Sequence, residues 1–434
     1  MTFEIKDERM VELRELLLPE TGPVWLRVGT LLDGEQKLRD AHLVYDAETI
    51  RYVGEQSAPA ELVKTGQGEP DAILPEHTVL PGLIEAHAHL FLEGGELDLG
   101  KRQRYLEQSP SELLEQAQGR LEKLVRMGIA GIRDAGDRNG VGLALAKQYA
   151  GVDRPVMPYL DSPGAAIYRK GRYGSFMGDP LEECPSLKEC VESRIQAGAH
   201  RIKIIPTGII NFKEGKVTAR PQMTAEEVAE IVGAAKVRGK QTFAHASGDE
   251  GIEVAITGGV DSVEHGFFVR DDQLMRMRDR GIAWVPTFAP VQEQVDHAKE
   301  LGWSEGVIGN LRRILDQHSA SLLKAHGMGV QIVAGSDAGS CGVPHGFGLM
   351  YELELMEKTG MPAVAVVNAA TGNSSRRLGF GERFGQIRAG YKARFIITGF
   401  SPMETVKNLR KEKAVLFDGR LYQANAGRAD CEGL

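Results

Sequence analysis

The chain has 434 residues, of which 42% are hydrophobic and 26% are charged, and its net charge is −8. This length exceeds that of a typical single domain, so one large domain with additions, or two to three domains, is expected. The negative charge disfavours nucleic acid and anionic membrane surfaces as partners.

The sequence carries no recognisable targeting or membrane segment. No stretch approaches 18 uninterrupted apolar residues, and the first ten residues, MTFEIKDERM, mix charges of both signs around no apolar core. The four cysteines show neither CxxC spacing nor the density of a disulfide scaffold. We therefore expect a reduced, cytoplasmic protein, with a periplasmic form lacking its leader as the alternative.

The two ends of the chain have a similar β-rich pattern. Residues 5–18 predict an amphipathic helix, and residues 24–79 then predict short antiparallel strands separated by turn residues. Residues 386–400 and 413–422 repeat the short-strand pattern near the C-terminal end. Because a small meander buries little surface by itself, we expect residues 1–79 and 376–434 to fold together as a small β-sandwich domain.

Between these ends, residues 80–375 alternate strand-like and helix-like segments. One helix is expected after Ser109, which caps it, with Pro110 at its first position and Gly128 at its end. Eight such units predict an α/β fold, a (β/α)8 TIM-like barrel, rather than an open sheet. The absence of GxGxxG after the first strand also disfavours a dinucleotide-binding fold. The predicted strands are residues 79–87, 128–136, 155–161, 199–208, 240–248, 260–268, 281–290 and 329–339.

The first of these strands ends in PGLIEAHAHL, where His87 and His89 are two residues apart. Residues i and i+2 of a strand face the same side, so both imidazoles can bind one transition metal. In barrels of this type the chemistry lies at the C-terminal ends of the strands. Other metal-capable residues that end predicted strands are Lys203, His245, His265 and Asp337.

Each of these four residues also has a simpler interpretation. His245 can be a core histidine, His265 can pair with its neighbour Glu264, Asp337 can cap the next helix, and Lys203 can extend to the barrel mouth. A lysine between apolar strand neighbours is nevertheless costly to bury. The recurrence of such residues at the same end of five strands favours a joint metal site.

The chain resembles the amidohydrolase superfamily, in its imidazolonepropionase-like and prolidase-like branch. The matching segments are PGLIEAHAHL, GIRDAGD, RIKIIPTG, FAHAS, VEHG, SDAG, NAATGNSSRRLG and GQIRAGYKARF. The resemblance implies two divalent metal ions, with zinc as the default and manganese or cobalt as alternatives. It places His87, His89 and Asp337 on one ion and His245 and His265 on the other, bridged by a carboxylated Lys203.

The implied reaction is hydrolysis of an amide or peptide-like C–N bond, in a dipeptide or an N-acyl amino acid, by a metal-bridging hydroxide. Asp337 would transfer the proton to the leaving nitrogen, with Lys203 and His265 completing the catalytic set. The alternatives are a cyclic amide hydrolase or deaminase of the imidazolonepropionase type, a carbamate or lactone hydrolase, and a catalytically inactive scaffold. The segment after Lys203 reads Thr207-Gly208-Ile209, where the family often has TGG, which weakens any transfer of specificity.

Substrate recognition is expected in the strand-to-helix loops. The loop SPGAAIYRKGRYGSFMG offers Tyr168, Arg169, Arg172 and Tyr173, and an arginine there can bind a substrate carboxylate; a solvated basic loop is the alternative. His345, in the loop after strand eight, faces the substrate in related enzymes, with a supporting or helix-capping role as the alternative. We expect a small-molecule substrate and a homo-oligomeric enzyme.

Overall fold

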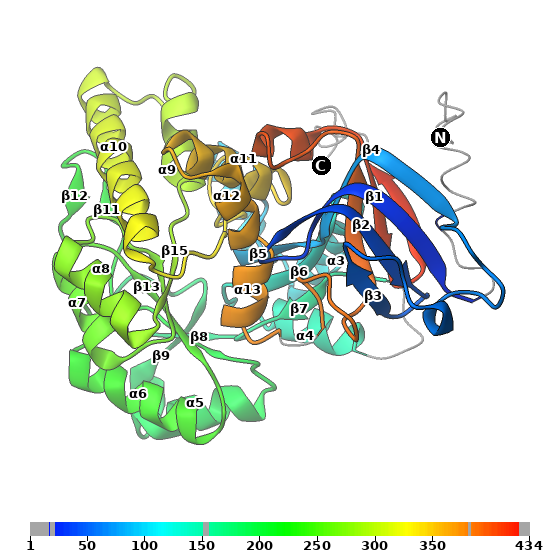
Figure 1. Cartoon of the computed structure of the whole chain (residues 1–434). Coiled ribbons are helices and arrows are strands. Elements are labelled where there is room, and N and C mark those ends of the chain that lie inside the picture. Colours follow the sequence, from blue (N-terminus) through cyan, green and yellow to red (C-terminus); the bar gives the residue numbers. More distant parts are fainter. Residues whose placement is uncertain (1–16, 18–21, 151–155, 381–382, 425–434) are drawn as a thin grey trace.

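The computed structural model describes residue 17 and residues 22–150, 156–380 and 383–424. Figure 1 shows a body of strands and helices next to a sheet that combines strands from the beginning and from the end of the chain. The helix predicted over residues 5–18 lies outside the described residues, except for Leu17, which is buried.

The strands of the two chain ends form one seven-stranded sheet, in the order β18-β17-β16-β4-β1-β2-β3. Antiparallel pairing of β16 with β4 joins the two ends, and β1, β2 and β3 form the antiparallel meander that the sequence predicts. Two features differ from expectation: β1 and β4 pair in parallel, and all seven strands belong to one sheet instead of the two sheets of a sandwich. The bounds are β1 (Val24–Leu32), β2 (Lys37–Tyr45), β3 (Ile50–Gly54), β4 (Ala72–Pro81), β16 (Arg394–Thr398), β17 (Lys413–Phe417) and β18 (Arg420–Ala424).

The central body is built on parallel strands. They form a three-stranded sheet, β5-β6-β7, and a six-stranded sheet, β15-β14-β13-β10-β8-β9. The strands are β5 (Leu83–Ala88), β6 (Ile129–Asp134), β7 (Tyr159–Asp161), β8 (Ala166–Tyr168), β9 (Gly178–Pro180), β10 (Ile202–Ile204), β13 (Thr242–Ala246), β14 (Ser262–His265) and β15 (Ala283–Val285).

Two parts of this body differ from the prediction. The segment 329–339 forms isolated bridges, from Ile332 to Trp284 and from Ala338 to Ala88, in place of a continuous strand. Its ladder is interrupted near Asp337, whose φ of 55° is incompatible with extended backbone. The strand β8 lies in the segment 162–178, which was expected to be a loop, and β9 begins at the last residue of that segment; both strands are only three residues long.

Helices cover the parallel strands (Figure 1), which gives the α/β arrangement expected from the sequence. The helix start predicted before β6 is present: Ser109 and Glu112 form a capping box, and Pro110 occupies the first position of α3. In the described parts of the chain, none of the helices combines the length and apolar character needed to cross a membrane. The helices are α2 (Leu99–Leu106), α3 (Pro110–Arg126), α4 (Val141–Gln148), α5 (Leu187–Gln196), α6 (Ala225–Val237), α7 (Asp249–Gly258), α8 (Asp271–Arg280), α9 (Ala289–Asp296), α10 (Glu305–Met328), α11 (Phe347–Lys358), α12 (Ala363–Ala369) and α13 (Gly372–Arg377).

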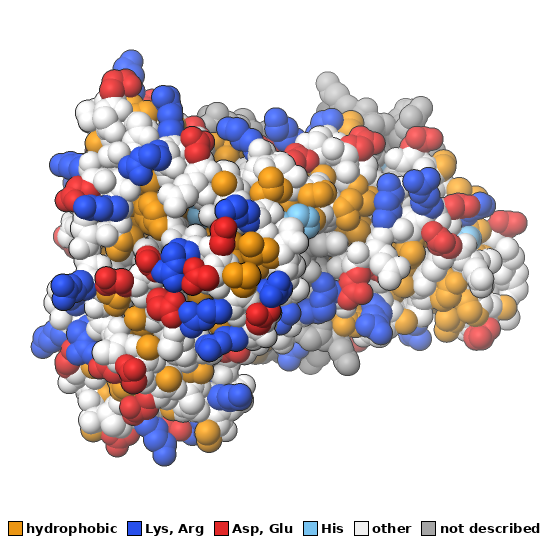
Figure 2. Space-filling model, turned by 60° about the vertical axis from the view of Figure 1, so that its left-hand side comes forward, with side chains coloured by type: hydrophobic (Ala, Val, Ile, Leu, Met, Phe, Trp, Pro, Cys, Tyr) orange, Lys and Arg blue, Asp and Glu red, His pale blue; other side chains and the backbone are white. Residues whose placement is uncertain are grey.

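Two surface features bear on the sequence-based expectations. On the face shown in Figure 2, Lys and Arg side chains are interspersed with Asp and Glu and do not gather into a basic patch. Cys184 and Cys190 form a disulfide across the start of α5, with their Cα atoms 5.3 Å apart. A disulfide differs from the reduced cysteines that the sequence led us to expect; the spacing of six residues carries no recognisable motif.

Candidate metal centre

Four histidines from strands of both parallel sheets come together at the ends of those strands. His87 belongs to β5 and His89 follows it, while His245 and His265 belong to β13 and β14. The ring centroids of His89 and His87 are 5.7 Å apart, those of His87 and His265 5.0 Å, and those of His265 and His245 4.4 Å. The structure thus brings together all four histidines that the sequence selects.

Asp337 joins the first two histidines. One ligand atom from each of His87, His89 and Asp337 lies within 4.8 Å of the others, and Asp337 Oδ1 is 3.6 Å and 3.5 Å from the two Nε2 atoms. The backbone N–H of Asp337 donates to the carbonyl oxygen of His87 at 2.7 Å. Asp337 is no helix cap, since α11 starts at Phe347 after Gly346. This triad has the donor types of a transition-metal site.

Lys203 comes from β10 and is buried, with 1% of its surface exposed. Its Nζ atom lies 4.7 Å from the centre of the Phe243 ring and so does not extend into solvent. Burial, together with the charge of nearby Arg133, lowers the pKa of the Lys203 ammonium to about 8 despite the opposing charge of Glu264. A buried lysine with an uncommitted amine is the group that the resemblance assigns as the bridge.

Three polar atoms at this centre are buried without a hydrogen-bond partner in the described structure: His87 Nε2, His265 Nε2 and Lys203 Nζ. Leaving a buried polar group unsatisfied costs about 1–3 kcal/mol. Such a concentration of unsatisfied donors and acceptors needs an explanation, and divalent cations would supply one, because neutral imidazole nitrogens are metal ligands. The residues present therefore fit a metal centre.

The other ring nitrogens of the histidines are anchored. His87 Nδ1 pairs with Glu264 Oε2 at 2.6 Å, His89 Nδ1 with the Gly136 carbonyl at 3.1 Å, and His265 Nδ1 with Thr287 Oγ1 at 2.8 Å. This arrangement leaves each Nε2 directed away from its anchor, which is how protein metal sites fix the ring and its tautomer. His245 differs, since its Nε2 lies 3.4 Å from the Gly208 carbonyl.

Glu264 is the centre of a buried network that the sequence did not reveal. Besides His87, its carboxylate accepts hydrogen bonds from Arg133 Nη2 and Ser262 Oγ, both at 2.6 Å, and it is fully buried. The sequence suggested Glu264 only as a partner of His265, but its carboxylate binds His87 instead. Arg133 lies in the GIRDAGD motif, whose arginine was the signal that could have pointed to this network.

A second carboxylate supports the same strand. Glu85 accepts hydrogen bonds from the backbone N–H of His87 and from both the N–H and the hydroxyl of Ser336. Burial raises its pKa to about 7. Glu85 therefore ties the segment that carries Asp337 to β5, and so fixes two parts of the triad relative to each other.

Burial sets the protonation of the metal-ligand candidates. It lowers the pKa of His89 and of His245 to about 3, with a further contribution from the charge of Lys203. Burial also raises the pKa of Asp337 to about 7. The histidines are consequently neutral at neutral pH, which is the form that coordinates metals.

The three residues predicted to bind substrate lie in different surroundings. Tyr168 packs in a small apolar cluster, Arg172 is exposed and donates to the Arg220 carbonyl at 2.6 Å, and His345 Nε2 pairs with the His89 carbonyl at 3.1 Å. His345 thus contacts the backbone of the segment that carries His87 and His89, as its supporting alternative would require. Their roles toward a substrate stay predictions.

Two aromatic side chains of the same loop lie against the histidine row. The ring of Tyr173 is 5.2 Å from that of His245, and the ring of Phe176 is 6.5 Å from that of His89. Burial and the negative charge of Asp337 raise the pKa of the Tyr173 phenol above its usual range. The sequence named Tyr173 as part of this loop, but gave no reason to place it at the metal centre.

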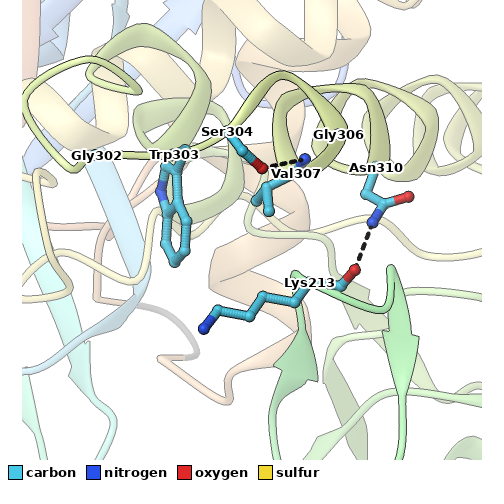
Figure 3. Close-up of a pocket in the computed structure, with 7 residues that line it drawn as sticks. All are labelled: Lys213, Gly302, Trp303, Ser304, Gly306, Val307 and Asn310. Atoms are coloured by element: carbon cyan, nitrogen blue, oxygen red, sulfur yellow. Dashed lines mark hydrogen bonds between the residues drawn. The ribbon is translucent and has the colours of Figure 1, made fainter.

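Two cavities border the loops that follow these strands. One, of about 250 Å³, is lined by Thr207, Ser247 and the start of α7, and the Thr207 hydroxyl donates to the His245 carbonyl. The other, of about 570 Å³, lies between α10 and the hairpin β11 (Ile210–Asn211) and β12 (Lys216–Val217), with Lys213 and Trp303 on its walls (Figure 3). The Asn310 side chain holds the Lys213 carbonyl across this space.

The amidohydrolase family profile matches residues 78–421 of this chain. The chain belongs to the amidohydrolase family. It is therefore a hydrolase of C–N bonds, as the sequence predicted, and the family is typically metal-dependent, in keeping with the His87, His89 and Asp337 triad.

Individual relatives agree with this assignment. Ochratoxinase of Aspergillus niger is 25% identical over 439 residues, covering 93% of this chain and 88% of that protein. Among solved structures, a Xaa-Pro dipeptidase with methionine bound in its active site has a TM-score of 0.77 and 27% identity, over 93% of this chain and 100% of the other. The ochratoxinase structure has a TM-score of 0.75 and 23% identity, over 93% and 96%. These neighbours are consistent with the prolidase-like branch, and they imply a TIM-like barrel with an additional domain.

Proposed function

We propose that this amidohydrolase is a binuclear enzyme that hydrolyses the amide bond of a dipeptide or an N-acyl amino acid. The observation that carries this proposal is the convergence of four histidines, Asp337 and Lys203, with His87 Nε2, His265 Nε2 and Lys203 Nζ buried and unsatisfied. The names of the relatives, a dipeptidase and an ochratoxinase, favour an amide or peptide-like substrate.

His87, His89 and Asp337 would hold one ion, His245 and His265 the other, and a carboxylated Lys203 would join them. Carboxylation suits this position because a protonated lysine would repel two cations, whereas a carbamate offers two anionic oxygens. Zinc is the default metal and manganese or cobalt are alternatives. When bound, the ions supply Lewis acidity to the substrate carbonyl and activate water.

The protein's own groups position the reactants and move the proton. Asp337 Oδ1 lies 3.6 Å from His87 Nε2 and 3.5 Å from His89 Nε2, where it can take a proton from the attacking water and pass it to the departing nitrogen. Glu264 and Arg133 hold the His87 ring in one orientation. No covalent enzyme intermediate is required in this scheme.

We also infer a closed eight-stranded barrel, with residues 1–79 and 376–434 as a separate domain around residues 80–375. Bridges from the segment 329–339 to Trp284 on one side and to Ala88 on the other support closure between β15 and β5. The hydrogen bond from the His200 N–H to the Ser162 carbonyl supports a contact beyond β7. The seven-stranded sheet of the two chain ends supports the domain assignment.

The deciding experiment is a screen of the zinc-loaded and manganese-loaded protein, prepared with bicarbonate, against dipeptides and N-acyl amino acids. Release of the free amino acid is measured by amine derivatisation, and metal content by elemental analysis. Two metal equivalents with amide turnover support the proposal. Turnover confined to cyclic amides, carbamates or lactones would refute the substrate class, and absence of bound metal would favour an inactive scaffold.

A further inference from the structure

The loop after β8 forms an aromatic cover over the histidine row. Phe176 contacts the ring of His89 and Tyr173 contacts the ring of His245, and the two aromatic rings pack edge to face at 5.8 Å. The cover therefore spans both halves of the metal centre. Phe176 carries no hydrogen-bonding group, so the phenol of Tyr173 is the donor that this pair of rings offers to a bound substrate.

Buried contacts fix the backbone of this loop. The Gln222 amide donates to the carbonyl oxygens of Tyr173 at 3.0 Å and Thr207 at 3.4 Å, and its oxygen accepts from the Arg169 N–H at 2.8 Å. Gly174 follows with a φ of 130°, and a Cβ there would come within 2.8 Å of the Tyr168 side chain. Both features hold Tyr173 in place, which is the preorganisation that an electrostatic catalyst needs.

The Tyr173 hydroxyl is uncommitted. In the described part of the chain it makes no hydrogen bond, and its pKa is raised mainly by burial and additionally by the charge of Asp337. Several other side chains near the centre are already committed: Arg133 and Ser262 donate to Glu264, and Ser336 donates to Glu85. A free phenol whose ring packs against His245 is therefore available to a substrate bound at the metal centre.

We propose that Tyr173 is a catalytic residue whose phenol O–H donates a hydrogen bond to the carbonyl oxygen of the scissile amide; this inference rests on the proposed amide hydrolysis. Addition of water forms the C–O bond, moves the carbonyl π pair onto oxygen and transfers one water proton to Asp337. As the C–N bond breaks, that pair re-forms the C=O bond and the nitrogen takes the proton from Asp337. The products are a carboxylic acid and an amine, and Tyr173 keeps its own proton throughout.

The test compares Tyr173→Phe with the wild-type holoenzyme. The variant keeps the ring that packs on His245 and loses only the hydroxyl. Because the bond is strongest when the oxygen is charged, we expect kcat to fall by about 10²–10³-fold, with little change in KM. Tyr52→Phe, which removes an exposed phenol hydroxyl from β3, is the matched control and should keep wild-type kinetics. Metal content should be the same in all three proteins.

A binding measurement separates the role of Tyr173 from the identity of the reaction. An N-phosphonyl amino acid has charged tetrahedral oxygens at the position of the reacting carbonyl and so resembles the transition state. Calorimetry should show that it binds at least about tenfold more weakly to Tyr173→Phe than to the wild type. The affinity of the product amino acid should not change. An active wild type whose Tyr173→Phe variant keeps both kcat and phosphonate affinity overturns the role of Tyr173 alone. A wild type that cleaves no amide overturns the function and this role together.

Discussion

The buried network around Glu264 makes the sharpest prediction, which concerns the variant Glu264→Gln. The glutamine keeps the size of the side chain but removes its charge. In the wild type, one fully buried carboxylate satisfies His87 Nδ1, Arg133 Nη2 and Ser262 Oγ at 2.6 Å each. The substitution leaves the Arg133 guanidinium, 1% exposed, as a buried cation without a counter-charge.

Two magnitudes follow from this geometry. Breaking a buried ion pair by removing one partner costs about 3–5 kcal/mol, because the remaining charge stays desolvated. Loss of the anchor on a metal-ligating histidine typically weakens metal binding by about 10–100-fold. We therefore expect a lower urea midpoint in the metal-free protein and a weaker affinity for the first zinc ion in the folded variant.

Urea unfolding followed by tryptophan fluorescence measures the first effect, and competition with a chromophoric chelator in the absence of urea measures the second. Asp40→Asn is the control, since it neutralises an exposed pair with Arg27 and asparagine tolerates the positive φ found there. It should leave both quantities unchanged. If Glu264→Gln has the wild-type midpoint and zinc affinity, the network neither stabilises the fold nor orients His87.

Three further predictions address the bridge, a buried carboxyl and the substrate loop. Lys203→Ala should lower bound metal from two equivalents to one and abolish turnover, whereas Lys413→Met, a change at another buried lysine, should keep both. Glu352 is buried, and burial raises its pKa to about 8. As the pH rises, the unfolded chain loses this proton before the folded protein does, so the free energy of unfolding falls between about pH 4.5 and pH 8. Glu352→Gln should flatten that part of the pH profile, as measured by urea unfolding. Arg172→Ala should raise KM about tenfold for N-acyl amino acids but not for their C-terminal amides, as measured by steady-state kinetics.

The sequence predicted the elements with strong local signals. Hydrophobic period and caps identified α3, where Ser109, Glu112 and Pro110 all act locally. Pairing between strands that are distant in the sequence was harder to predict. The parallel pairing of β1 with β4 depends on which strand edges remain free, and no sequence pattern in these strands indicates it. The short strands β8 and β9 were missed because three residues are too few to show a period.

At the site, the sequence identified the candidate metal ligands but not the residues that support them. A histidine at the end of an apolar strand is conspicuous because burial makes it costly, but His87, His245 and His265 were selected jointly, because metal-capable residues recur at the same end of five predicted strands. Glu264 and Arg133 lie 131 residues apart, and their pairing through β14 and β6 emerges only from the folded arrangement. Tyr173 was named within its loop, but its contact with His245 depends on how Gln222 holds that loop.

The backbone at the centre carries strain that links the ligands to their surroundings. His265, Thr287 and Asp337 all have positive φ values, 67°, 50° and 55°, which cost free energy for residues with a side chain. Each is held by contacts outside its own strand: the His265 ring bonds the Thr287 hydroxyl, and the Asp337 N–H bonds the His87 carbonyl. Thr287 is a β-branched residue in this conformation, where the penalty is greatest. Such strain persists only when the surroundings determine the position of the side chain, and here it turns His265 and Asp337 toward the same space as His87.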